Sequence, residues 1–232
     1  MQNAEALKRA AAERAAEWIE DGMALGLGTG STVRHLLDVI AERRARGEWG
    51  GIVGVPTSED TAARARRLGI PLASLAEHPR LDLTIDGADE VDPELRLIKG
   101  LGAALLREKV VASVSERLVI VADESKVVER LGTRAPLPVE VDPFAEPVLL
   151  DYFRSLGAEP EPRRAEGGEP RVTDGGNHIV DCRFPEGIAH PEALEAALLV
   201  RPGVLETGLF LGMATAAVIA AADGVRVMGE GR

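Results

Sequence analysis

The chain has a single cysteine and few lysines, and both shortages limit the kinds of functional site that it can form. Cys182 alone excludes an internal disulfide and a zinc cluster built from cysteines, and it fits a reducing cytosol. Of the 27 lysine and arginine residues, four are lysines: Lys8, Lys99, Lys109 and Lys126. A compact ammonium can do what a planar guanidinium cannot, so a chain this rich in arginine should keep lysine at functional positions. The alternative explanation is codon bias toward arginine, with the four lysines retained by chance.

The chain also lacks a basic charge balance and a long apolar run. Its net charge of −11 disfavours a nucleic-acid partner, because binding to the phosphate backbone needs a basic face. An anionic substrate would then need a locally positive site. The longest charge-free span, 207–222, is shorter than the ~18 to 20 apolar residues of a membrane helix, and the first residues are unlike a signal peptide. We therefore expect a cytoplasmic protein with no membrane partner.

Short apolar segments alternate with helical patterns over the first 132 residues. We predict helices near 4–20, 31–46, 58–69 and 103–113, and strands near 23–27, 52–55, 81–86, 95–98 and 118–122. Such alternation is typical of α/β proteins, here a Rossmann-like parallel sheet with helices on both faces.

Four prolines between residues 136 and 147 mark a change in the pattern. After them we predict strand 137–141, helix 144–156, strands near 158–164, 170–174 and 178–183, helix 191–200 and a last strand near 203–206. Apart from one extra strand, this is the β-α-β-β-α-β order of a ferredoxin-like α+β domain. The apolar tail beyond Thr207 should return to the first domain. The predicted domains are therefore 1–132 with 207–232, Rossmann-like, and 133–206, a smaller α+β domain inserted near the C-terminus.

A glycine-rich turn joins the first predicted strand to its helix. It reads Gly-Leu-Gly-Thr-Gly-Ser-Thr over residues 26–32. Backbone N–H groups at a helix start attract anions, and glycines let a ligand approach them closely. The hydroxyl groups of Ser31 and Thr32 would suit a phosphate. The turn matches neither the dinucleotide fingerprint nor a Walker loop, and a tight turn with a serine N-cap is the alternative.

Charged residues follow two more of the predicted strands. Asp86, Asp89 and Glu90 follow the strand at 81–86, and Lys99 follows the strand at 95–98. Open α/β sheets bind their ligands beyond the carboxyl ends of the strands, so these side chains are candidates for a site. Turn capping around Gly87 and a magnesium site at the paired carboxylates are the alternatives, although no further ligand cluster supports a metal.

Glu108 lies in an otherwise apolar predicted helix. It stands between Arg107 and Lys109, and three successive residues sweep ~200° of a helix, so the three cannot share a narrow solvent-facing stripe. A carboxylate turned toward a cleft or the core has its pKa raised by desolvation, as a general base near neutral pH requires. A surface glutamate paired with a neighbouring helix is the alternative.

The other reactive residue types form no recognisable site. His35, His78, His178 and His190 show no metal-ligand spacing, and the chain has no G-x-S-x-G elbow of a hydrolase. We expect the histidines to be structural.

Together these residues resemble those of the type A ribose-5-phosphate isomerases, over essentially the whole chain. The similarity rests on the turn at 26–32, on Asp-Gly-Ala-Asp-Glu at 86–90, on Lys-Gly-Leu-Gly-Ala-Ala-Leu-Leu-Arg-Glu-Lys at 99–109, and on Ala-Asp-Glu-Ser-Lys at 122–126. The second and third motifs in tandem are highly specific. One departure is Leu101, where the family often has glycine; it bears on a backbone contact and on no catalytic side chain.

The resemblance implies an aldose–ketose isomerase of the non-oxidative pentose phosphate pathway. It would interconvert D-ribose 5-phosphate and D-ribulose 5-phosphate through an enediolate, without metal or organic cofactor. The implied catalytic residues are Glu108 as general base, Lys99 beside the developing oxyanion, and Asp86 with Asp89 for opening the furanose ring. The implied substrate-binding residues are Lys8, Thr29, Gly30, Ser31, Thr32, Asp86, Gly87, Ala88, Asp89, Lys99, Gly100, Leu101, Gly102 and Lys126. Those expected at the phosphate are Lys8, Ser31, Thr32 and Lys126.

The resemblance also implies a homodimer or a tetramer, with a small sugar phosphate as ligand. A rival interpretation is a sugar-phosphate-sensing domain of the same fold, as in some bacterial repressors, which binds without turnover. Two observations oppose this interpretation. The chain shows no DNA-binding segment, and it has all the charged residues of the implied catalytic site. Coenzyme A transferases and amino-sugar-phosphate deaminases are related in fold, but their motifs differ from the two tandem motifs at 86–90 and 99–109.

Overall fold

The computed structural model describes residues 2–229. The chain folds as two compact units. The first comprises Met1–Ala88, Arg107–Lys126 and Met213–Arg232, and the second comprises Asp89–Leu106 and Val127–Gly212.

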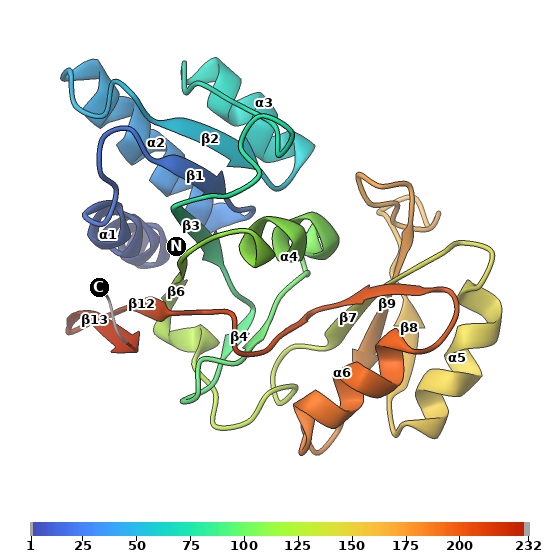
Figure 1. Ribbon diagram of the computed structural model, residues 1–232. Coiled ribbons are helices and arrows are strands. Elements are labelled where there is room, and N and C mark those ends of the chain that lie inside the picture. The colour runs from blue at the N-terminus through green and yellow to red at the C-terminus, as the bar shows by residue number, and fades with distance from the viewer. Residues whose placement is uncertain (1, 230–232) are drawn as a thin grey trace. The chain divides into compact units, whose positions relative to one another are not determined.

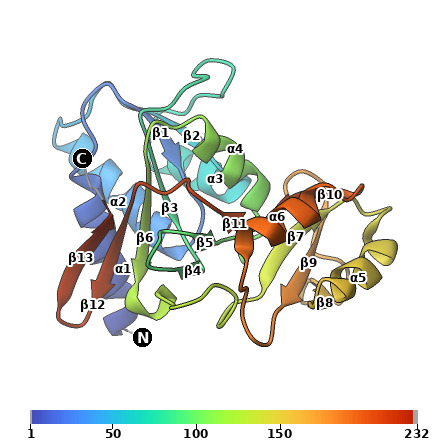
Figure 2. The ribbon, with the colours of Figure 1, turned by 60° about the horizontal axis from the view of Figure 1, so that its bottom comes forward.

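A six-stranded sheet forms the centre of the first unit. Its order is β13-β12-β6-β3-β1-β2. The strands are β1 (Ala24–Leu27), β2 (Val53–Pro56), β3 (Leu83–Gly87), β6 (Leu118–Asp123), β12 (Ala216–Ala221) and β13 (Gly224–Gly229). Neighbouring strands run parallel except β13, which pairs antiparallel with β12 as a hairpin at the sheet edge (Figure 1; Figure 2). The predicted parallel sheet is confirmed for the other five strands, and the antiparallel edge strand β13 is an addition to it.

Helices cover both faces of this sheet. They are α1 (Gln2–Ala16), α2 (Ser31–Ala45), α3 (Glu59–Arg67) and α4 (Leu105–Ser113). On one face, Leu25 of β1 and Leu83 of β3 share an apolar cluster with Leu36 of α2, and burying each leucine stabilises the unit by roughly 1.5 to 3 kcal/mol. On the other face, Val111 of α4 packs over Gly26, where a side chain would collide with it. Successive strand residues point to opposite faces, so α2 and α4 lie on opposite sides of the sheet.

A four-stranded antiparallel sheet forms the centre of the second unit. Its strands are β7 (Leu137–Val141), β8 (Glu159–Pro162), β9 (His178–Arg183) and β10 (Val204–Thr207). Helix α5 (Glu146–Ser155) connects β7 to β8, and α6 (Pro191–Leu199) connects β9 to β10 (Figure 1). The strand order β10-β7-β9-β8 and the β-α-β-β-α-β chain order are those of a ferredoxin-like fold, as predicted.

The two helices of this unit pack side by side on one face of its sheet. Val180 of β9 shares an apolar cluster with Phe153 of α5 and Leu198 of α6. Between the helices, the Tyr152 hydroxyl donates a 2.7 Å hydrogen bond to the Ala197 carbonyl. The residues that alternate with Val180 along β9 therefore point to the opposite face.

A short three-stranded antiparallel sheet completes the second unit. It consists of β4 (Glu90–Val91), β5 (Leu97–Ile98) and β11 (Leu209–Phe210). Beyond β5, Ala103 and Leu105 cluster with Ile179 on the face of β9 that is turned away from the helices. Strand pairing and packing thus join 89–106 to the second unit, whereas the sequence-based boundaries place that stretch in the first domain.

The strand predicted at 95–98 does not join the parallel sheet. One oxygen of Asp92 accepts hydrogen bonds from the backbone N–H groups of Glu94 and Arg96, both at 2.9 Å, and Leu95 adopts a φ of 60°. This tight turn sends the chain back antiparallel along β4. Lys99 therefore does not extend from the edge of the parallel sheet, which corrects the sequence-based expectation.

The strand predicted at 170–174 is not formed either. The chain there makes isolated bridges, from Arg164 to Pro170 and from Val172 to His178. Pro170 has no N–H to donate to a ladder, and Thr173 enters a tight turn closed by a 2.9 Å hydrogen bond from the Gly176 N–H. The antiparallel sheet of the second unit therefore lacks the extra strand that the sequence predicted.

None of the helices within residues 2–229 has the length and apolar character needed to cross a membrane.

Candidate active site

The carboxyl ends of β1, β3 and β6 lie next to one another in the first unit. Because these strands are parallel neighbours, their ends meet at one edge of the sheet, where α/β proteins bind ligands. The turn at 28–30 follows β1, Asp86 and Gly87 end β3, and the 3-10 turn η1 (Glu124–Lys126) follows β6. Three predicted segments that are distant in sequence therefore reach one edge.

Asp86 is held in a fixed orientation at this edge, with 1% of its surface exposed. Its Oδ1 accepts hydrogen bonds from the backbone N–H groups of Thr29 at 3.0 Å and Gly87 at 2.7 Å. A Cβ atom on Gly28 would lie 2.1 Å from the same oxygen. Glycine at position 28 is thus what lets the turn approach the carboxylate.

The turn leads directly into α2. Gly30 is the N-cap, with a φ of 118° that favours glycine, and Ser31 is the first helical residue. This corrects the alternative in which a serine caps the helix. The first N–H groups of a helix lack partners within the helix and attract anions, and the hydroxyls of Ser31 and Thr32 belong to this first turn. Their contact with a phosphate stays a prediction.

The Thr29 hydroxyl belongs to a cluster of hydroxyl groups that sequence reasoning missed. It lies 2.8 Å from Thr57 Oγ1 and 2.9 Å from Ser58 Oγ. Thr61 Oγ1 donates a 2.8 Å hydrogen bond to the Gly28 carbonyl, and Ser58 caps α3 by accepting from the Thr61 N–H. The side chain of Thr29 therefore fastens the turn to α3. The signal in the sequence was the hydroxyl pair Thr57-Ser58 at the end of β2.

Glu108 is the buried member of the three charged residues in α4. Its exposed fraction is 4%, whereas Arg107 and Lys109 are half-buried. Arg107 points to the surface, where it makes a 2.9 Å ion pair with Glu59. The prediction that one of the three turns inward is confirmed, and the surface-glutamate alternative for Glu108 is excluded.

Glu108 and Asp86 belong to the same side of the first unit's sheet. Thr84 Oγ1 of β3 lies 2.6 Å from Ser115 Oγ, just beyond the end of α4, so Thr84 points to the face that α4 covers. Asp86 is two residues further along β3 and points to the same face. Asp86 and the helix that carries Glu108 therefore lie on the same face of this sheet.

Two of the predicted phosphate ligands are lysines of the first unit. Lys8 on α1 makes a 2.8 Å ion pair with Glu5, and Lys126 ends η1 after β6. Hydrogen bonds from Lys8 and His35 hold the pKa of the Glu5 carboxyl below its usual range. A phosphate at Lys8 would therefore compete with Glu5 for the ammonium.

Lys99 is buried in the second unit, with 2% of its surface exposed. Its Nζ lies 5.3 Å from the centre of the Phe210 ring, a cation–π contact. Its backbone N–H donates a 2.9 Å hydrogen bond to the Gly208 carbonyl, and a side chain at position 208 would strike the Lys99 carbonyl. The meeting of β5 and β11 therefore fixes the backbone of Lys99.

Asp89 holds the turn that follows Lys99. Its Oδ2 accepts a 2.9 Å hydrogen bond from the Leu101 N–H, and its own N–H donates to the Ile98 carbonyl at 2.8 Å. The Leu101 side chain is exposed, so a leucine at this position disturbs no packing. The Leu101 N–H is engaged by Asp89 and is therefore not available to a substrate. The predicted backbone contact of Leu101 with substrate stays a prediction.

Glu90 serves the fold of the second unit. It is fully buried, and its two oxygens accept hydrogen bonds from the N–H groups of Gly132, Arg134 and Ala135 at 2.5 to 2.7 Å. Sequence reasoning grouped this carboxylate with a possible magnesium site, whereas its contacts fasten residues 132–135. Across residues 2–229 there is no group of three or more His, Cys, Asp or Glu side chains that could hold a metal ion.

The predicted site residues divide between the two units. Those in the first unit are Lys8, Thr29, Gly30, Ser31, Thr32, Asp86, Gly87, Ala88, Glu108 and Lys126. Those in the second unit are Asp89, Lys99, Gly100, Leu101 and Gly102.

Comparison with known proteins decides the family. The sequence pattern of the family described as ribose 5-phosphate isomerase A (phosphoriboisomerase A) matches residues 53–224. The chain belongs to the ribose 5-phosphate isomerase A family. It is 57% identical over 218 residues to ribose-5-phosphate isomerase A of Roseiflexus castenholzii, covering 94% of this chain and 93% of that protein. It is 54% identical over 223 residues to the Gloeobacter violaceus protein of the same name, covering 96% and 95%.

Solved structures of the family support the fold. Ribose 5-phosphate isomerase from Plasmodium falciparum matches with a TM-score of 0.94 at 37% identity, covering 98% of this chain and 100% of that one. A D-ribose-5-phosphate isomerase in complex with phospho-erythronic acid matches with a TM-score of 0.95 at 39% identity, covering 98% and 99%. The predicted fold class and family are thereby confirmed.

Proposed function

We propose that this chain interconverts D-ribose 5-phosphate and D-ribulose 5-phosphate. The observation that carries the proposal is the buried Glu108, on the same side of the sheet as the fixed carboxylate of Asp86. A family member with this pair has a base and a second proton-transfer group for a sugar.

Glu108 moves the proton in the isomerisation step. It removes the proton from C2 of the open-chain aldose, and the electron pair of that C–H bond moves through the C1–C2 bond to the aldehyde oxygen. The resulting enediolate gains a proton at O1 and loses the proton of the C2 hydroxyl. Protonated Glu108 then delivers its proton to C1, and C2 becomes the ketone. A carboxylate suits both steps because it acts first as base and then as acid.

Lys99 stabilises the negative charge of the enediolate oxygen. Its 2% exposure supports this role, because a charge acts more strongly where water is excluded. Stabilisation of a developing oxyanion is usually the largest single catalytic contribution. The neighbouring Gly100 and Gly102 contribute backbone N–H groups to the substrate, whereas Leu101 binds Asp89 and Arg163 through its backbone.

Asp86 and Asp89 open the furanose ring. The carboxylates relay the proton of the C1 hydroxyl to the ring oxygen, so that the C1–O bond breaks and the aldehyde forms. Gly87 and Ala88, between the two carboxylates in the chain, contact the sugar. The hydrogen bonds from Thr29 to Asp86 and from Leu101 to Asp89 orient the two carboxylates before substrate arrives.

The phosphate group binds at the start of α2. Gly30, Ser31 and Thr32 supply N–H and hydroxyl donors there, and Thr29 contributes its backbone. Lys8 and Lys126 supply positive charge, which an acidic chain needs at this point to hold an anion. Three of the four lysines thereby gain a role.

Isomerisation should proceed without a metal ion or cofactor. Purified protein incubated with ribose 5-phosphate and EDTA should form ribulose 5-phosphate, followed by the ketose colour reaction or by NMR, at the rate seen without EDTA. A rate that falls on chelation and returns with a divalent ion would refute the mechanism. Binding of the sugar phosphate without turnover would instead favour the sensing domain.

We also propose that the protein forms a homodimer, or a tetramer of two such dimers. Three apolar side chains at the ends of the helices of the second unit support an interface: Phe144 is 95% exposed, Val200 76% and Val148 65%. Monomeric proteins rarely expose apolar side chains in groups. Phe144→Asp should shift the mass measured by light scattering to that of a monomer. Val225→Asp, on β13 of the first unit, is the control, and an unchanged dimer in the Phe144 variant would contradict the assignment.

A cytoplasmic location fits the only cysteine of the chain. Cys182 is buried in β9, and burial raises the pKa of its thiol. Such a thiol stays protonated and unreactive at neutral pH. Because a single cysteine cannot form an internal disulfide and fits a reducing compartment, we propose that the protein works in the cytoplasm.

A further inference from the structure

Arg163 joins the sheet of the second unit to the turn that follows Lys99. Its Nη1 donates hydrogen bonds to the carbonyls of Gly100 at 2.8 Å and Leu101 at 3.1 Å. Its Nε donates to one carboxylate oxygen of Asp181 at 2.7 Å, and its Nη2 donates to the other. One guanidinium therefore binds a carboxylate and two backbone carbonyls together, which its rigid fork of five N–H donors allows.

The turn that Arg163 binds is strained. Gly100 has a φ of 109° and Ala103 a φ of 60°, and residues other than glycine rarely adopt this left-handed region. Backbones of this kind persist only where the surroundings hold them. Asp89 binds the Leu101 N–H, and Arg163 binds the carbonyls of Gly100 and Leu101. The turn is thus held through both its donors and its acceptors.

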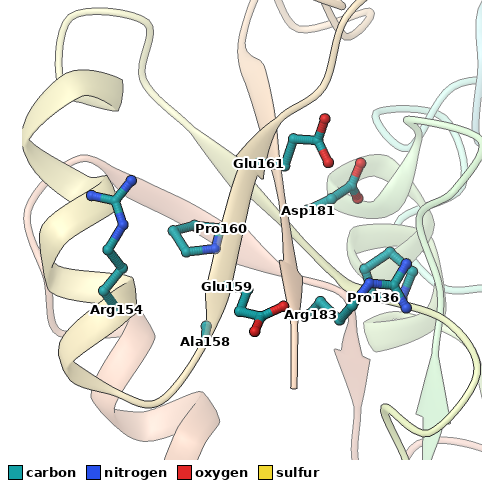
Figure 3. A pocket seen from close by; sticks show the side chains of 8 residues that line it. All are labelled: Pro136, Arg154, Ala158, Glu159, Pro160, Glu161, Asp181 and Arg183. Atoms are coloured by element: carbon teal, nitrogen blue, oxygen red, sulfur yellow. The ribbon is translucent and has the colours of Figure 1, made fainter. Parts of the chain in front are cut away.

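Asp181 sits in an electrostatic setting that favours Arg163 as its partner. It lies opposite Glu161 in the β8–β9 ladder, and like charges directly opposite each other destabilise a sheet. Figure 3 shows these two carboxylates together at one end of a pocket, with Glu159 and Arg183, the next opposed pair on the same face, at the other end. The guanidinium of Arg163 offsets the repulsion at the first pair. Asp181 in turn fixes the orientation of the guanidinium.

We propose that Arg163, oriented by Asp181, is a positioning residue for Lys99. By fixing the carbonyls that directly follow Lys99, it sets the place of the Lys99 ammonium while the enediolate forms. Arg163 touches no reacting atom. This inference rests on the proposed role of Lys99.

The first test is Arg163→Met, which keeps the length of the stem and removes every donor. Misplacement of a catalytic group by ~1 Å can cost 10²-fold, so kcat should fall by about 10- to 100-fold with little change in KM. Arg163→Lys, which keeps one donor group, should recover part of the loss. Arg183→Met is the matched control, because Arg183 is exposed on β9 beside Asp181 and should keep wild-type kcat.

A double-mutant cycle separates positioning from general stability. Asp181→Asn should lower kcat alone but add nothing in the Arg163→Met background, because both act through one guanidinium. Thermal unfolding of each variant gives the folded fraction at the assay temperature. Wild-type kcat in Arg163→Met, additive losses, or a loss equal to the unfolded fraction would each overturn the inference. Lys99→Arg is assayed in parallel: if that variant keeps wild-type activity, it is the role of Lys99 that fails.

Discussion

Glu108→Gln should lower kcat by about 10² to 10⁴-fold while KM changes little. Glutamine keeps the size and the hydrogen-bonding shape of the side chain but cannot accept the proton from C2. Because Glu108 is 4% exposed, a substitution of equal volume is the one that this packed position tolerates best. The loss should therefore fall on proton transfer and leave binding in place.

Exchange with solvent measures that step directly. In D₂O, wild-type protein should exchange the C2 proton of ribose 5-phosphate, as followed by NMR, and the Glu108→Gln variant should not. Glu116→Gln is the control, since it makes the same chemical change at an exposed glutamate shortly after α4. If the Glu108 variant exchanges the proton at the wild-type rate, another group is the base, and Asp86 is the next candidate.

The fold was predictable where local pattern and burial agree. The strands of the parallel sheet are buried on both faces, so each appears in the sequence as a short apolar run between helical patterns. A strand was predicted at 95–98, but its antiparallel pairing with β4 gave no such signal, because β4 has two residues and the turn is made by the side chain of Asp92. Pairing with β11, over a hundred residues later, places β5 in the second unit, and no local pattern indicates such a pairing.

The side chains proposed to contact the ligand were easier to find in the sequence than those that hold them in place. Glu108 stood out as a charge in an apolar helix, and the motif around Lys99 carried the family. The functions of Thr61, Glu90 and Arg163 follow from contacts with residues 33 to 63 positions away. No periodicity or short motif encodes such contacts, since each depends on the packing of two distant segments.

Lys99→Arg should damage activity although the charge is kept. Loss of one oxyanion-stabilising donor costs on the order of 10² to 10³-fold in kcat, and the larger, delocalised guanidinium should not place its charge where the ammonium stands. The 2% exposure of Lys99 and its contact with Phe210 leave little room for adjustment. An overpacked core position also destabilises by roughly 1 to 3 kcal/mol, so thermal unfolding must be measured beside the kinetics.

Two further variants separate the effect of charge placement from that of packing. Lys99→Met keeps the stem without the charge and should lose as much kcat as the arginine variant, with a smaller loss of stability. Lys109→Arg makes the same exchange at a half-buried lysine of α4 that has no role in the proposed chemistry, and its kcat should stay near wild type. If Lys99→Arg is folded and as active as Lys109→Arg, the ammonium is not the oxyanion partner, and Lys99 returns to a structural role beside Phe210.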